Sequence, residues 1–164
     1  KGQNLNGPQF EFSGETFSPD GRTIAYNAIE AREQPVNRFR VHVVNRDGTG
    51  DRAIPAPLAT GFSQAWPQFS PDGKTLLLDT WESKPDGSLI HQLAVAPADG
   101  SAIARRIGPI VDSTDQVKMW SPDGSRILQC MCDRQELYTI DPVTGSFEKL
   151  PWTGDLPGWQ RLAR

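Results

Sequence analysis

Phe17-Ser18-Pro19-Asp20-Gly21-Arg22-Thr23-Ile24-Ala25-Tyr26 is the stretch of sequence that decides the fold. It recurs as Phe69-Ser70-Pro71-Asp72-Gly73-Lys74-Thr75-Leu76-Leu77-Leu78 and again as Trp120-Ser121-Pro122-Asp123-Gly124-Ser125-Arg126-Ile127-Leu128-Gln129. The serines that follow the aromatic residues are 70 − 18 = 52 and 121 − 70 = 51 residues apart. A near-constant period of this length is typical of propeller blades and other repeat arrays.

Each Ser-Pro-Asp-Gly segment predicts a tight turn between two strands. Proline presets φ at the second turn position, glycine accepts a positive φ, and the serine and aspartate side chains can bond nearby backbone N–H groups. We assign Asp20, Asp72 and Asp123 to these turns and predict no metal site, because a divalent ion needs its oxygen ligands in one small cage. No cofactor is predicted either.

The residues after each turn predict a strand that is buried on both sheet faces. Apolar residues occupy consecutive positions in Ile24–Ala28, Leu76–Thr80 and Ile127–Cys132. Third strands are expected at 39–45, 89–96 and 136–141, and fourth strands at 52–55, 102–107 and 146–150. Phe17, Phe69 and Trp120 should lie buried at the ends of the innermost strands.

Four antiparallel strands per repeat predict an all-β fold, a partial β-propeller. We expect three four-stranded antiparallel blades at about residues 10–58, 59–110 and 111–151, with the first strand of a fourth blade at 155–164. Propellers usually have at least four blades. The chain is therefore expected either to be part of a longer propeller or to associate with another copy for closure.

The three repeats resemble the TolB-type propeller family, a relative of WD-type repeats with an aromatic-Ser-Pro-Asp-Gly-Lys signature. An acid five positions before the aromatic residue and a proline two before it belong to the same pattern, and Asp115, Pro67 and Pro157 match them. The resemblance implies a periplasmic or extracellular protein that binds a protein or peptide partner in envelope complexes.

Charge and cysteine content exclude several other classes. The formal net charge is 17 − 20 = −3, and the arginines are too scattered for a nucleic-acid surface. No apolar run approaches the length of about 18 residues that a membrane helix needs. Cys130 and Cys132 are expected to remain thiols, because Cα atoms two positions apart on a strand are about 6.6 Å apart, at the long limit for a disulfide.

The sequence contains no recognisable catalytic motif. Its two histidines, His42 and His91, lie in predicted third strands, and neither a nucleophile elbow nor a phosphate-binding glycine loop is present. The sequence therefore predicts a non-catalytic binding scaffold. One alternative is the propeller domain of a prolyl-oligopeptidase-like serine peptidase whose hydrolase domain is absent here; a more distant one is a metal-dependent sugar lyase propeller.

A binding surface is expected at the channel mouth, along the approaches to the innermost strands. These approaches come from different blades and can converge on one ligand. The candidate residues are Gln64, Trp66, Asp115, Lys118 and Asp155. The competing interpretation is that they only form hydrogen bonds with neighbouring turns.

Overall fold

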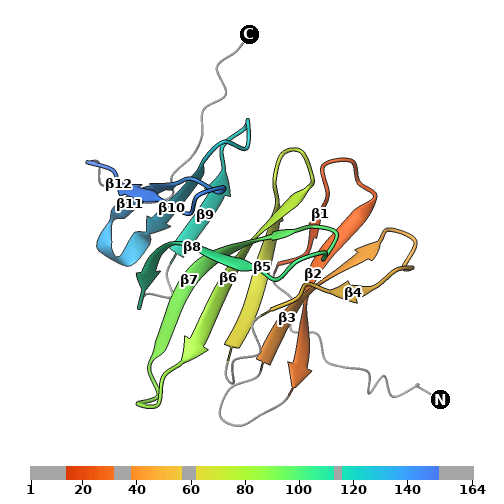
Figure 1. The fold of residues 1–164 in the computed structure, drawn as a ribbon, viewed down its shortest axis with the longest axis horizontal. Helices are drawn as coiled ribbons and strands as arrows, with labels where there is room; N and C mark the ends of the chain where they lie inside the picture. The colour runs from red at the N-terminus through yellow and green to blue at the C-terminus, as the bar shows by residue number, and fades with distance from the viewer. Residues whose placement is uncertain (1–13, 32–37, 57–61, 113–115, 152–164) are drawn as a thin grey trace, which may run out of the picture.

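The structure, a computed structural model, describes residues 14–31, 38–56, 62–112 and 116–151. These residues form three four-stranded antiparallel sheets that follow one another in chain order (Figure 1). The predicted all-β fold with three blades is therefore confirmed. The predicted strand at 155–164 lies outside the described residues.

Each sheet contains the strands of one repeat. Sheet 1 has the order β1 (Thr16–Phe17), β2 (Thr23–Ala31), β3 (Arg38–Asn45), β4 (Arg52–Ala53). Sheet 2 has the order β5 (Phe62–Phe69), β6 (Thr75–Ser83), β7 (Leu89–Pro97), β8 (Arg105–Val111). Sheet 3 has the order β9 (Gln116–Trp120), β10 (Ile127–Met131), β11 (Glu136–Ile140), β12 (Phe147–Lys149).

The only helical element in the described ranges is the 3-10 turn η1 (Cys132–Arg134), between β10 and β11. No helix in these ranges has the length and apolar character needed to cross a membrane. The outer strand of the second repeat begins three residues later and ends four residues later than predicted, because its pairing with β7 starts at Arg105 and runs past Ile107 to Val111.

The Ser-Pro-Asp-Gly turns have the predicted hydrogen bonds. In the first turn, Ser18 Oγ donates to Asp20 Oδ1 (2.6 Å) and accepts from the Thr23 N–H (2.9 Å). The other two turns repeat both bonds. The serine hydroxyl and a backbone N–H lower the pKa of each turn aspartate, in the case of Asp123 to about 2. The turns are therefore stabilised by hydrogen bonds among residues at most five positions apart.

Successive turns also pack against one another. A Cβ atom added to Gly73 would lie 3.3 Å from Pro19 Cδ, and one added to Gly124 would lie 3.5 Å from Pro71 Cδ. Each of these glycines thus packs closely against the proline of the preceding repeat. Gly21, in the first turn, has no such neighbour among the described residues.

A second repeated contact joins the outer parts of the sheets. Arg52, at the start of β4, donates to the Asp99 carbonyl (3.0 Å) in the turn before β8. Arg105, one repeat later at the start of β8, donates to the carbonyls of Pro142 (2.6 Å) and Val143 (2.8 Å). Each arginine thereby ties its sheet to the outer turn of the next one.

Two separate apolar cores lie between the sheets. The first interface, between sheets 1 and 2, buries mostly small residues: Ala25, Val41, Val43, Ile54, Leu76, Leu78, Ala94, Ala96, Ala98 and Ala104. The second interface, between sheets 2 and 3, buries larger ones: Leu77, Leu93, Val95, Ile107, Ile127 and Ile140. Adjacent residues of β6 and β7 face opposite neighbours, as expected for strands covered on both faces.

The three repeat aromatics occupy equivalent backbone positions but differ in burial. Phe17, Phe69 and Trp120 each pair with the residue seven positions later. Phe69 packs partly buried against the first core and Trp120 against the second, whereas Phe17 is 58% exposed. The prediction that Phe17 is buried is therefore wrong, because no described sheet covers the outer side of sheet 1.

Candidate functional site

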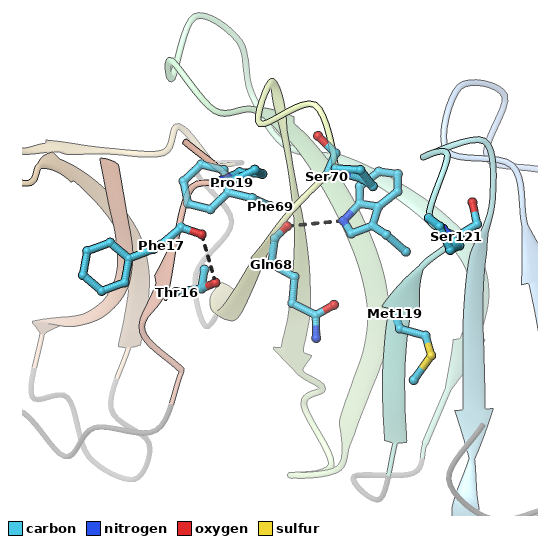
Figure 2. A pocket seen from close by; sticks show the side chains of 11 residues that line it. Thr16, Phe17, Pro19, Gln68, Phe69, Ser70, Met119 and Ser121 are labelled. Carbon is cyan, nitrogen blue, oxygen red and sulfur yellow. Dashed lines mark hydrogen bonds between the residues drawn. The ribbon is translucent and has the colours of Figure 1, made fainter. Parts of the chain in front are cut away.

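The candidate site is the wall formed by the first strand of each sheet. β1, β5 and β9 are edge strands, so each keeps one side free of strand pairing. Their turn-proximal ends surround a groove of about 830 Å³ (Figure 2). It is lined by Thr16, Phe17, Pro19, Gln68, Phe69, Ser70, Pro71, Met119, Trp120, Ser121 and Pro122.

The groove is uncharged. None of its lining residues is ionisable at neutral pH, and its hydroxyl groups are largely engaged: the Oγ atoms of Ser70 and Ser121 donate to turn aspartates and accept backbone N–H groups. Figure 2 shows the ring of Phe17 turned away from Gln68 and Phe69, so Phe17 contributes mainly its backbone. Such a lining can bind apolar and neutral polar groups but offers no general acid or base.

Two hydrogen bonds join β5 to β9 across the boundary between the sheets. Gln68 Nε2 donates to the Lys118 carbonyl (3.1 Å), and Trp120 Nε1 donates to the Gln68 carbonyl (3.4 Å; Figure 2). Each bond links a side chain of one strand with the backbone of the other. They hold these two sides of the groove at a fixed separation.

Trp66 lies two residues further up β5, where the pairing with β6 is interrupted by a bulge between Ala65 and Gln68. Its φ is 48°, and its N–H donates to Asn27 Oδ1 (2.9 Å) of sheet 1. The indole is centred 5.5 Å from that of Trp81, and Trp66 as a residue is 41% exposed. It is the one large apolar side chain of β5 that is exposed.

A buried polar cluster lies behind the wall, at the second interface. Lys118 Nζ on β9 lies 2.8 Å from Asp79 Oδ2 on β6, and both side chains are less than a tenth exposed. Burial raises the pKa of Asp79, although Lys118 opposes the shift. His91 stacks on Trp81, and neither ring nitrogen has a hydrogen-bond partner in the described structure. Burial lowers its pKa, against the influence of Asp79.

The residues predicted for the site have different environments. Gln64 is fully buried and donates to the Ile54 carbonyl (2.7 Å), Lys118 is buried in its ion pair, and Trp66 is partly exposed. Asp115 and Asp155 lie outside the described residues. The prediction of which residues bind a ligand remains a prediction, but the structure does not bring Gln64, Trp66 and Lys118 together on one exposed surface.

Sequence reasoning missed the groove and the role of Asp79. The groove residues belong to the repeat that was assigned to turns, and only the side-by-side arrangement of the inner strands makes them a concave surface. Asp79 did carry a signal, because it is the single acid in the apolar run Leu76–Thr80. An acid in a doubly buried strand needs a partner, and that partner is Lys118.

Metal-binding and redox features are sparse in this part of the chain. No three or more His, Cys, Asp or Glu side chains of the described ranges are grouped so that they could hold a metal ion. Cys130 and Cys132 are thiols, as predicted, with their Sγ atoms 3.0 Å apart.

Known structures share the fold. No protein-family model and no curated protein matches the sequence. An oligogalacturonate lyase solved with manganese matches with a TM-score of 0.56 and 22% identity, over 77% of this chain and 32% of that one. Hydrazine synthase of Kuenenia stuttgartiensis matches with a TM-score of 0.56 and 13% identity, over 77% of this chain and 38% of that one. A Bacteroides ovatus protein assigned as a dipeptidyl aminopeptidase IV matches with a TM-score of 0.59 and 16% identity, over 80% of this chain and 23% of that one.

These matches correct one prediction from the sequence. The chain was expected to be non-catalytic, but the solved proteins that share its fold are described as enzymes. The inference from missing motifs to a missing activity was wrong, because a propeller segment can belong to an enzyme whose reacting groups lie elsewhere. The chain spans only 23% to 38% of the length of these neighbours, and at this identity the likeness concerns the fold alone.

Proposed function

We propose that the chain supplies three blades to the propeller of a peptidase, and that its axis-facing groove binds an uncharged, apolar segment of the peptide substrate. The observation that carries the proposal is the lining of the groove: aromatic, proline, methionine, amide and hydroxyl groups, with no ionisable side chain. Binding is therefore assigned to this chain, and the chemical step to residues beyond the groove.

A peptide suits the wall for two reasons. The inner strands are sheet edges, which extended peptides recognise through main-chain hydrogen bonds, while side-chain pockets provide specificity. The apolar part of the lining favours apolar side chains. The fold shared with the dipeptidyl aminopeptidase IV-like protein supports the same assignment. The resemblance to TolB-type repeats also favours a peptide or protein ligand.

An anionic sugar polymer fits the groove poorly. Oligogalacturonate carries a carboxylate on each residue, and carboxylates in a binding site are normally met by cations or several N–H donors. The groove offers no lysine, arginine or histidine. The lyase alternative therefore has no support from the residues of this site.

The test is peptide binding measured by calorimetry, with an acetylated and amidated alanine-based octapeptide carrying one phenylalanine. Met119→Glu introduces a charge into the groove and should weaken binding about tenfold. Val143→Glu adds the same charge outside the groove, at a residue that is 81% exposed, and should leave binding unchanged. Equal affinities of the two variants, or tighter binding of oligogalacturonate than of the peptide, would show that the groove is not a peptide site.

A further inference from the structure

We infer that Trp66 is a second contact point for the same peptide and stacks on an apolar ring, a proline or aromatic side chain, two or three residues from the segment in the groove. The inference rests on the proposed function and adds a sequence requirement to the substrate.

The backbone at Trp66 is strained. Among the described residues, Trp66 and Gln135 are the two non-glycine residues with positive φ. Gln135 follows η1 at an exposed turn, where such angles are common. For a bulky residue inside a strand, a φ of 48° is a genuine outlier, and outliers of this kind concentrate where binding or catalysis requires them.

Neighbouring groups hold Trp66 in this conformation. Asn27 accepts its N–H at 2.9 Å, and the ring of Trp81 lies on one side of the indole. Gly14 leaves the room that the indole needs: a Cβ atom there would lie 3.0 Å from Trp66 Cδ1 and 3.0 Å from Asn27 Nδ2. Contacts from two sheets thus converge on one residue.

The exposure of Trp66 distinguishes an aromatic residue that can contact a ligand from one that only packs in the interior. Trp81, which packs between Phe39, Trp66 and His91, is 7% exposed, as an interior aromatic should be. Trp66 is held by Asn27 and Trp81 and is still 41% exposed. A rigid, solvent-facing aromatic ring offers a ready stacking surface for a flat or apolar ring of a ligand.

The position of Trp66 determines how far apart the two contacting residues lie in the peptide. Trp66 and Gln68 are two residues apart on β5, which is at most about 7 Å, because the bulge between Ala65 and Gln68 shortens the strand here. An extended peptide that lies along β5 advances by about 3.4 Å per residue. A ring on Trp66 and an apolar residue in the groove are therefore two or three positions apart in the ligand.

The probes are blocked alanine-based octapeptides with either one phenylalanine or two separated by two or three positions. On the wild-type protein the two-ring peptide should bind about tenfold more tightly. Trp66→Asn should remove this gain and lower the melting temperature only slightly, because asparagine tolerates positive φ although the contact with Trp81 is lost. Trp66→Phe should keep most of the gain. The control is Gln135→Asn, which makes the same kind of substitution at the other positive φ, outside the groove. This variant should keep the whole tenfold gain in affinity.

The outcomes separate this inference from the proposed function. If Trp66→Asn keeps the tenfold gain and melts at a lower temperature, Trp66 is an inter-sheet packing residue and the inference is overturned. The proposed function survives that result as long as Met119→Glu still weakens the one-ring peptide. If the wild-type protein binds neither peptide, both proposals fail.

Discussion

The two interfaces between the sheets use the same repeat but different chemistry. The first is packed mostly with alanine and valine and is crossed by hydrogen bonds to backbone carbonyls, from Gln64 Nε2 to Ile54 and from Arg52 Nε to Asp99. The second is packed with leucine, isoleucine and valine and contains the buried ion pair between Asp79 and Lys118. Equivalent blades can therefore be joined by close approach of small residues or by larger side chains around a buried charge pair.

The difference predicts which kind of substitution destabilises each interface most. Small residues let the strands of sheets 1 and 2 approach closely, so the first interface should be sensitive to added volume. A buried ion pair is costly to desolvate and becomes strongly destabilising when one partner is removed. The second interface should therefore be sensitive to the loss of one charge.

The largest expected effect is that of Lys118→Met. It leaves the Asp79 carboxylate buried without its cation and should lower the free energy of unfolding by about 3–5 kcal/mol. The double variant with Asp79→Leu should recover stability to near the wild-type value or above it. Urea titrations measure both. Gln64→Leu, at the first interface, unpairs only a carbonyl and should cost about 1–3 kcal/mol. A Lys118→Met cost no larger than that of Gln64→Leu would show that the pair is not strongly desolvated.

Added volume should affect the two interfaces unequally. Ala94 is fully buried in the first core, so Ala94→Leu should cost about 1–3 kcal/mol by overpacking. Val95→Leu changes the next residue of β7, which faces the second core, by one methylene and should cost less than about 1.5 kcal/mol. The two are compared by thermal and urea unfolding. If Val95→Leu is the more destabilising, the first interface is not the more tightly spaced one.

The smallest expected effect is the loss of stability that His91 causes on acidification. Burial lowers its pKa below the ordinary 6.5, so the unfolded chain takes up a proton at a higher pH than the folded chain does. His91 thus makes stability fall as the pH drops through 6.5 towards the lower pKa of the folded state. His91→Phe keeps a ring against Trp81 and should lose less stability than the wild type between about pH 7.5 and about pH 5.5. Identical losses in the two proteins would contradict the buried neutral histidine.

Much of the fold could be predicted because its signals are local. Ser18, Asp20 and Gly21 interact with residues at most five positions away, so the sequence of one turn contains nearly all the information for its structure. The candidate site was less predictable. Trp66 is exposed on the wall, but Gln64 and Lys118 are buried. Their partners, the Ile54 carbonyl just after β4 and Asp79 on β6, belong to the preceding repeat, which local patterns cannot place beside them.

The sequence by itself determined the repeat and its turns, since these follow from side-chain and backbone hydrogen bonds within a few residues, and counting the repeats predicted the three blades of the described residues. Only the tertiary structure decided that Phe17 is exposed while Phe69 and Trp120 are partly buried, because burial of an inner-strand aromatic requires a sheet about 50 residues away. The same holds for the pairing of Asp79 with Lys118 and for the strained backbone of Trp66, which depend on contacts between blades.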